Sequence, residues 1–147
     1  AGTGSVSVEL AAQCRRGTVC AVECRSEACA LIRANREKFC VWNLRVAEGC
    51  APEALVELPA PEGVFIGGSG GALEAIVAVA LQKNKRARIV ISAITLETVG
   101  QAMEALRKHG LMPEAAQLAV SETKAAGALH LLQANNPVFL IAGGGHG

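Results

Sequence analysis

Two glycine-rich segments are the residues of this sequence best suited to binding chemistry. The first, Gly2-Thr3-Gly4, precedes a segment with a helical pattern. A glycine pair before a helix presents backbone N–H groups and the helix N-terminus to a ligand. The second, Gly67-Gly68-Ser69-Gly70-Gly71, follows a short apolar run. Glycine tracts cost conformational entropy, so this run indicates close backbone approach to a ligand or a nest of N–H groups for an anion. A loop without function is the alternative.

An acidic residue strengthens the first of these signals. Glu23 ends an apolar run about 20 residues after the first glycine pair, where a carboxylate can accept hydrogen bonds from ribose hydroxyls. An ordinary solvated carboxylate at a strand end is the alternative. The segment Gly4 to Glu9 lacks the third glycine that makes room for a pyrophosphate. The order of glycine loop, helix, strand and acid therefore indicates a nucleotide-type ligand, and S-adenosylmethionine rather than a dinucleotide.

Two further segments follow apolar runs in the same way. Gly49-Cys50-Ala51-Pro52 is placed to border an adenine ring, with Ala51 leaving space for it; a plain turn before a helix is the alternative. Ser92 to Thr98 carries hydroxyl groups and a carboxylate. Helix capping by Thr95 is an equally good interpretation of that segment.

These segments need a scaffold that brings them to one edge. Apolar runs predict strands over 18–22, 44–47, 63–66, 89–91, 116–120 and 138–142. Periodic patterns predict helices over 5–14, 26–39 with Ser26 as its cap, 72–82, and from Thr95 or Thr98 to 109, with one or two helical turns within 52–58. Alternating strands and helices predict an α/β fold with helices on both faces of a mainly parallel sheet, the last two strands antiparallel. Ligands then lie at the carboxyl ends of the strands.

Composition limits the remaining function classes. The chain has 147 residues, 51% of them apolar, a net charge of +1 and only 3% aromatic residues. One domain is expected, with no nucleic-acid stacking platform and no membrane span. The six cysteines and three histidines lack the spacings of a zinc site, so we expect no metal and most cysteines reduced in the core, in a cytoplasmic protein.

The glycine and hydroxyl segments together resemble one family, the decarboxylating precorrin methyltransferases of cobalamin biosynthesis. The resemblance is carried by Ala1-Gly2-Thr3-Gly4-Ser5-Val6-Ser7-Val8-Glu9, Ala51-Pro52-Glu53-Ala54-Leu55, Val64-Phe65-Ile66-Gly67-Gly68-Ser69-Gly70-Gly71, Ala93-Ile94-Thr95-Leu96-Glu97-Thr98 and Asn136-Pro137-Val138. The resemblance implies a class I (Rossmann-like) methyltransferase that uses S-adenosylmethionine. It also implies methylation of ring carbon 15 of a precorrin and loss of carbon dioxide from the ring-C acetate.

The resemblance also implies a set of site residues. The methionine part of the cofactor would lie against Ala1, Gly2, Thr3 and Gly4, its ribose against Glu23 and its adenine against Cys50 and Ala51. The tetrapyrrole would face Gly67, Gly68, Ser69, Gly70, Gly71 and Thr95, with Lys124 a further candidate for its carboxylates. No residue identifies itself as the acid or base of the decarboxylation.

The sequence departs from the family in two places. Cys50 stands where the family commonly has an acidic residue before the alanine of the adenine loop. The family's strand leading into the first glycine loop is absent. We therefore expect 1–142 to be a methyltransferase domain without its N-terminal strand, 143–147 to be a flexible tail, and S-adenosylmethionine binding to be weak unless the upstream segment is supplied.

Other functions and partners stay open at this point. A methyltransferase for another small acceptor, or a non-catalytic nucleotide-fold interaction domain, is the alternative. The expected partner is a precorrin. Association into a homo-oligomer and fusion to an upstream carbon-5 methylase domain are further expectations.

Overall fold

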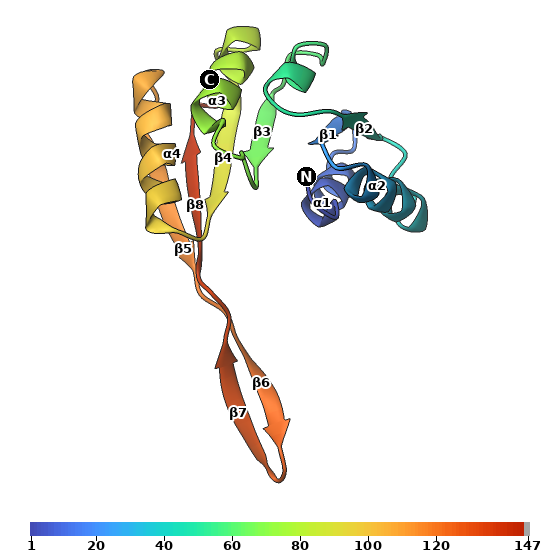
Figure 1. The fold of residues 1–147 in the computed structure, drawn as a ribbon, viewed down its shortest axis with the longest axis vertical. Coiled ribbons are helices and arrows are strands. Elements are labelled where there is room, and N and C mark those ends of the chain that lie inside the picture. The colour runs from blue at the N-terminus through green and yellow to red at the C-terminus, as the bar shows by residue number, and fades with distance from the viewer. Residues whose placement is uncertain (146–147) are drawn as a thin grey trace.

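The computed structural model describes residues 1–145 and shows an α/β fold with a long projecting hairpin (Figure 1). The helices are α1 (Ser5–Gln13), α2 (Ser26–Lys38), α3 (Leu73–Lys83) and α4 (Leu96–Lys108), with a short 3₁₀ turn η1 at Glu53–Leu55. The strands are β1 (Val19–Glu23), β2 (Leu44–Glu48), β3 (Gly63–Ile66), β4 (Arg88–Ala93), β5 (Glu114–Leu118), β6 (Ser121–Ala126), β7 (Leu129–Ala134) and β8 (Val138–Gly143). The predicted fold class and the order of strands and helices before β5 are confirmed.

The strands form three hydrogen-bonded groups. β1 and β2 are parallel, with Glu23 opposite Glu48. The largest group has the order β3-β4-β8-β5, in which β3 and β4 are parallel and β8 is antiparallel to both of its neighbours. The predicted antiparallel pairing of the last body strands, β5 and β8, is therefore confirmed. β6 and β7 pair only with each other.

Two hydrophobic clusters hold these groups to their helices. α3 and α4 pack on the four-stranded sheet, where Val77, Ile89, Leu106 and Ile141 are fully buried. α1 and α2 enclose a smaller cluster with β1 and β2, centred on Ile32 and Leu44. Burial of apolar area supplies the main stabilisation of both clusters. Among residues 1–145, no helix is long and apolar enough to cross a bilayer.

The helix caps agree with the sequence at α4 and differ at α2. Thr95 caps α4, because its side-chain oxygen accepts a hydrogen bond from the N–H of Thr98 over 3.2 Å. Ser26 was predicted to cap α2, but it is the first helical residue. Arg25 occupies the cap position and makes no side-chain capping bond. The helical pattern of a sequence locates such a boundary only to within one or two residues.

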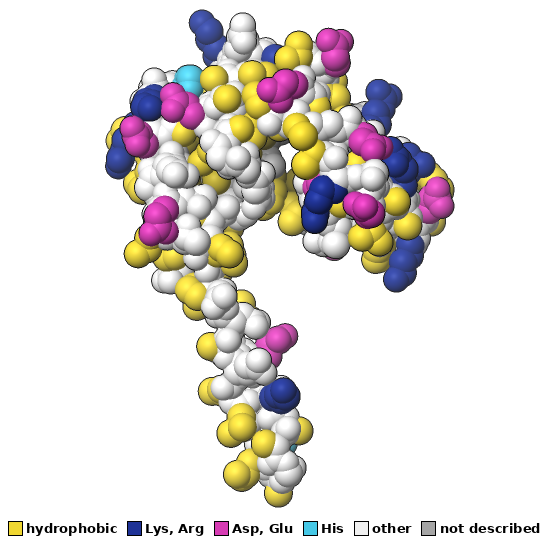
Figure 2. All heavy atoms as spheres, in the orientation of Figure 1, with side chains coloured by type: hydrophobic (Ala, Val, Ile, Leu, Met, Phe, Trp, Pro, Cys, Tyr) yellow, Lys and Arg dark blue, Asp and Glu magenta, His cyan; other side chains and the backbone are white. Residues whose placement is uncertain are grey.

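The β6–β7 hairpin was not predicted. Its strands are joined by the two-residue turn Gly127-Ala128, with Gly127 in a left-handed conformation (φ 62°). Every residue of both strands is exposed, including Leu129, Leu131 and Leu132. Figure 2 shows the hairpin as a narrow arm with hydrophobic side chains along its length. Because apolar residues lie on both of its faces, the sequence lacks the alternation by which a half-buried strand is found.

Three other expectations meet the structure differently. Within the described part of the chain, β1 pairs only with β2 and β3 only with β4, so each has one edge without a strand; the further central strand stays a prediction. The predicted tail is wrong at Gly143, which ends β8, and the carbonyl of Gly144 accepts a hydrogen bond from Arg88 over 2.8 Å. Residues 146–147 of that tail lie outside the described residues.

The cysteines are less buried than predicted. All six are free, but only Cys29 is buried. Cys14 and Cys20 are half-buried, and the exposed ones are Cys24, Cys40 and Cys50. The expectation that most are small core residues is therefore wrong. Cys24 and Cys50 lie just after the ends of β1 and β2, outside the segments that pack against the helices.

Candidate functional site

The first glycine loop is shaped by two different constraints. Gly4 has φ 82°, and a Cβ there would lie 2.8 Å from Cγ1 of Ile32, so only glycine fits. Its carbonyl accepts the N–H of Val8 over 2.8 Å and starts α1. Gly2 has φ 61°, but a Cβ there would meet no atom within 4 Å. The Gly4 side of the loop is therefore packed into the protein, whereas the Gly2 side faces open space.

Glu23 is brought against this loop. Its Oε2 accepts hydrogen bonds from the Ala1 amine and from the N–H of Gly2, each over 2.8 Å, and its Oε1 accepts one from the N–H of Arg25 over 3.1 Å. The side chain is 8% exposed. The Ala1 amine, followed by the Gly2 N–H, holds the pKa of Glu23 far below its usual range against the opposing effect of burial. The carboxylate is therefore ionised at neutral pH.

The end of β2 lies beside the same carboxylate. The N–H of Gly49 donates to the carbonyl of Glu23 over 2.9 Å, which ties the two strand ends together. The Cys24 thiol, as hydrogen-bond partner and through its charge, raises the pKa of Cys50. Ala51 is half-buried and packs against the cluster under the four-stranded sheet. Three of the predicted cofactor residues, Gly2, Glu23 and Cys50, therefore lie together at the carboxyl ends of β1 and β2.

These residues fit an adenosine-type ligand. Open space at Gly2 permits close approach to the backbone, and an ionised strand-end carboxylate is the type of group that accepts hydrogen bonds from ribose hydroxyls. Because both oxygens of Glu23 already accept N–H groups, ribose hydroxyls would replace some of these bonds. Ala51 adds a small side chain at the neighbouring strand end. The assignment of individual atoms of a cofactor to Ala1, Thr3, Cys50 or Ala51 stays a prediction.

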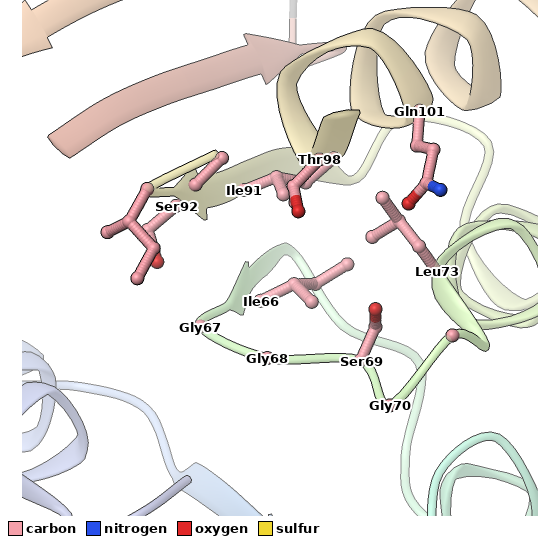
Figure 3. A pocket seen from close by; sticks show the side chains of 13 residues that line it. Ile66, Gly67, Gly68, Ser69, Gly70, Leu73, Ile91, Ser92, Thr98 and Gln101 are labelled. Carbon is pink, nitrogen blue, oxygen red and sulfur yellow. The ribbon is translucent and has the colours of Figure 1, made fainter. Parts of the chain in front are cut away.

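A cavity of about 260 Å³ lies at the carboxyl ends of β3 and β4. Its walls come from the second glycine loop, the end of β4 and the first turns of α3 and α4, as Figure 3 shows. The lining residues are Ile66, Gly67, Gly68, Ser69, Gly70, Gly71, Leu73, Ile91, Ser92, Ala93, Ile94, Thr98 and Gln101. Gly68, Gly70 and Gly71 have no atom within 4 Å of a built Cβ, so their backbone borders open space.

The sequence predicted the glycine loop of this cavity but not every residue of the cavity wall. The five residues from Gly67 to Gly71 line the cavity, as expected for an acceptor site. Thr95 is not among the lining residues, and its hydroxyl is engaged with Thr98 over 2.9 Å. Its proposed contact with the acceptor stays a prediction. Thr98 and Gln101 do line the cavity, one and two turns into α4, and a helical spacing of three residues from Thr95 could have indicated both.

Other candidate residues lie elsewhere. Lys124 is exposed on β6 of the projecting hairpin and does not line the cavity. The basic segment from Lys83 to Arg88 lies at the opposite end of α3, where Lys85 and Arg86 are exposed and Lys83 and Arg88 are half-buried. Among residues 1–145, no group of three histidine, cysteine or acidic side chains is arranged to hold a metal ion.

Comparison with known proteins gives a consistent result over nearly the whole chain. The precorrin methyltransferase domain family matches residues 1–142. The probable cobalt-precorrin-6B C(15)-methyltransferase (decarboxylating) of Pyrobaculum calidifontis is 41% identical over 142 residues, which are 95% of this chain and 73% of that protein. The cobalt-precorrin-6B C(15)-methyltransferase (decarboxylating) of Salmonella typhimurium is 36% identical, over 97% of this chain and 74% of that protein. The crystal structure of precorrin-6y C5,15-methyltransferase from Geobacter metallireducens superposes with a TM-score of 0.91 at 38% identity, covering 97% of this chain and 76% of that one.

Proposed function

Because the chain belongs to the precorrin methyltransferase domain family, we propose that it methylates carbon 15 of a precorrin and removes carbon dioxide from an acetate side chain of the same molecule. One observation carries the proposal. The two glycine loops that the sequence singles out lie at strand ends, one beside an ionised carboxylate and the other lining a cavity. A transferase needs two adjacent sites of this kind, one for a donor and one for an acceptor.

The cofactor of the proposed reaction is S-adenosylmethionine, which when bound supplies a methyl group on a positively charged sulfur. The protein residues bind and orient. Glu23 would hold the ribose through its carboxylate, and the Gly2 N–H, which donates to that carboxylate, fixes the loop that would lie against the methionine part. The second glycine loop would position the acceptor, whose electron-rich ring carbon is the nucleophile. Holding the two reactants in line removes much of the entropic barrier to their reaction.

The names of the relatives favour cobalt-precorrin-6B as the acceptor. The curated relatives from Pyrobaculum and Salmonella carry that name and carbon 15 alone. The structural neighbour from Geobacter is named for precorrin-6Y and for two carbons. The sequence spans 73 to 74% of those two relatives. We therefore propose the single-carbon, decarboxylating reaction.

A product assay tests this function. The protein is incubated with S-adenosylmethionine and either cobalt-precorrin-6B or its cobalt-free counterpart, and the products are measured by mass spectrometry. We expect a product that has gained a methyl group and lost carbon dioxide. If neither acceptor is converted while S-adenosylmethionine still raises the melting temperature, the chain is a cofactor-binding domain with another acceptor. If no cofactor raises it, the non-catalytic interaction domain is the better interpretation.

We also propose that the β6–β7 hairpin contacts a second copy of this chain. Three leucines on the arm are 56 to 76% exposed, and both of its edges lack a further strand within the described residues. An isolated two-stranded hairpin is marginally stable in water, so an arm of this length gains stability when another surface covers it. Glu122 and Lys124 share one face of the arm with Leu129 and Leu131, so an antiparallel copy can pair opposite charges as well as apolar side chains.

A further inference from the structure

We propose that the cavity at the ends of β3 and β4 is the place where the acetate loses carbon dioxide, and that the absence of charge in its lining favours this loss. This inference rests on the proposed function and adds the part of the site that performs its second half. The side chains of Gln101 and Thr98 orient the acetate.

The lining has two kinds of residue. Ile66, Leu73 and Ile91 form an apolar floor, and each is at most 5% exposed. Around them the side chains of Ser69, Thr98 and Gln101 point toward the same space from the glycine loop and from α4 (Figure 3). These groups, with Ser92, are neutral hydrogen-bond donors. Among the residues of the described chain that line the cavity, none is lysine, arginine, histidine, aspartate or glutamate.

The two cations of α4, Arg107 and Lys108, lie at its C-terminal end, and Arg107 is exposed. Lys108 ends α4 and pairs with Glu74 over 3.0 Å and with Glu104 over 3.6 Å. It follows Gln101 by seven residues, a rise of about 10 Å along the helix axis. The basic residues from Lys83 to Arg88 lie at the other end of α3. An acetate held at Ser69, Thr98 and Gln101 therefore meets neutral hydrogen-bond donors, and none of the described residues that line the cavity carries a charge.

The chemistry of decarboxylation makes this arrangement useful. The bond between the carboxylate carbon and the methylene carbon breaks, carbon dioxide leaves, and the bonding electron pair passes to the methylene carbon and its conjugated ring. That carbon then takes one proton from water and becomes a methyl group, so R–CH₂–CO₂⁻ and H⁺ give R–CH₃ and CO₂. The negative charge is concentrated on two oxygens before the step and spread over the ring during it.

An uncharged lining with an apolar floor acts on the starting state more than on the transition state. A carboxylate that leaves water for such a site loses hydration that neutral donors replace only in part. The spread charge of the transition state loses less. A cation in the same place would do the opposite, because it would stabilise the concentrated charge of the carboxylate most. The lining therefore lowers the barrier to loss of carbon dioxide, while its hydroxyl and amide groups fix the orientation of the acetate.

A positive charge placed at Gln101 tests the inference. Gln101→Lys is compared with Gln101→Met, which keeps the length without charge or amide, and with Gln82→Lys, the same change at the exposed far end of α3. Each protein is given S-adenosylmethionine and cobalt-precorrin-6B. Mass spectrometry then separates methylated product that has lost carbon dioxide from methylated product that retains it. Thermal unfolding shows that each variant is folded.

The ratio of the two products decides the outcome. We expect Gln101→Lys to raise the fraction of methylated product that retains its carboxylate about tenfold or more relative to Gln82→Lys. Methylation itself should be slowed less than the loss of carbon dioxide. Gln101→Met should not raise that fraction. If Gln101→Lys does not fold, Ser69→Lys places the charge on the opposite rim and must raise the same fraction. An unchanged ratio in a folded lysine variant overturns the inference. Absence of methylation by the unaltered protein overturns the proposed function instead.

Discussion

The backbone N–H of Gly2 donates a hydrogen bond to Oε2 of Glu23 over 2.8 Å, which joins the first glycine loop to the end of β1. We predict that Glu23→Gln weakens S-adenosylmethionine binding about tenfold to a hundredfold, because it removes charge-assisted hydrogen bonds to the ribose and loosens the loop. Glu48→Gln, at the register-paired but exposed position on β2, is the matched control. Isothermal titration calorimetry measures both. Equal affinities of the two variants would remove Glu23 from the cofactor site.

The same carboxylate makes the protein acid-sensitive. Hydrogen bonds from the Ala1 nitrogen and the Gly2 N–H lower the pKa of Glu23 in the folded state, whereas the unfolded chain has the ordinary value of about 4.3. The stabilisation is therefore fully present above about pH 5 and is lost as the pH falls below it, since the unfolded state then binds more protons. Urea denaturation from pH 7 to pH 3 should show a steeper loss of unfolding free energy for the unaltered protein than for Glu23→Gln. Parallel curves would contradict the prediction.

The two glycines of the first loop should differ in their tolerance of alanine. Gly4→Ala places a Cβ 2.8 Å from Ile32 in a left-handed backbone, so we expect a loss of about 2–4 kcal/mol of unfolding free energy. Gly2→Ala meets open space and should lose only about 1–2 kcal/mol, the cost of the conformation itself. Because Gly2 borders the proposed cofactor, its alanine variant should nonetheless bind S-adenosylmethionine more weakly. Denaturation and calorimetry on the same samples separate the two effects; equal stability losses would refute the packing argument.

Thr95 has a structural role that can be separated from any role in acceptor binding. Its hydroxyl caps α4, so Thr95→Ala should lower the unfolding free energy by about 1 kcal/mol, and Thr95→Ser should restore most of it. The measurement is chemical denaturation, with product formation measured in parallel. If Thr95→Ser restores stability and leaves turnover near that of the unaltered protein, capping accounts for the residue. A serine variant that is stable but loses turnover would instead place the Thr95 methyl group against the acceptor.

The leucines of the hairpin should control self-association. Leu129 and Leu131 lie on one face of the arm, and changing both to glutamate places two charges on a surface proposed to be covered. We expect the molar mass from light scattering to fall to that of one chain. Leu31→Glu, a change at a leucine 50% exposed on α2, is the control and should leave the mass unchanged. A monomeric mass for the unaltered protein at micromolar concentration would rule out the proposed contact.

The sequence was most informative where local pattern and chemistry coincide. β3, the glycine loop after it and α3 were all predictable, because an apolar run, five small residues and a periodic segment follow one another without a gap. The place of Glu23 at the end of β1, beside the first glycine loop, was predictable from its spacing to those glycines. The same reasoning failed for β6 and β7, whose residues are exposed on both faces and so show no burial period.

The wall of the cavity shows a second limit of prediction from the sequence. The family resemblance implied that Thr95 faces the acceptor, but a residue that begins a helix tends to turn its side chain back to the helix backbone. Thr98 and Gln101 line the cavity from α4, which packs on the sheet through contacts that include Leu106 and Ile141. Those contacts join residues distant in sequence, so helical spacing can indicate which residues share a face but not that this face borders the cavity.

The place of β8 in the sheet has a consequence for the order of folding. β8 is the last strand of the chain, yet it lies between β4 and β5. On the ribosome, β4 emerges with one edge unpaired and stays so until the hairpin arm and β8 have followed it. During that interval the nascent chain exposes a bare strand edge next to apolar residues, a feature that favours mispairing with other chains. The acceptor cavity, which rests on β4, can therefore become rigid only after β8 has been synthesised.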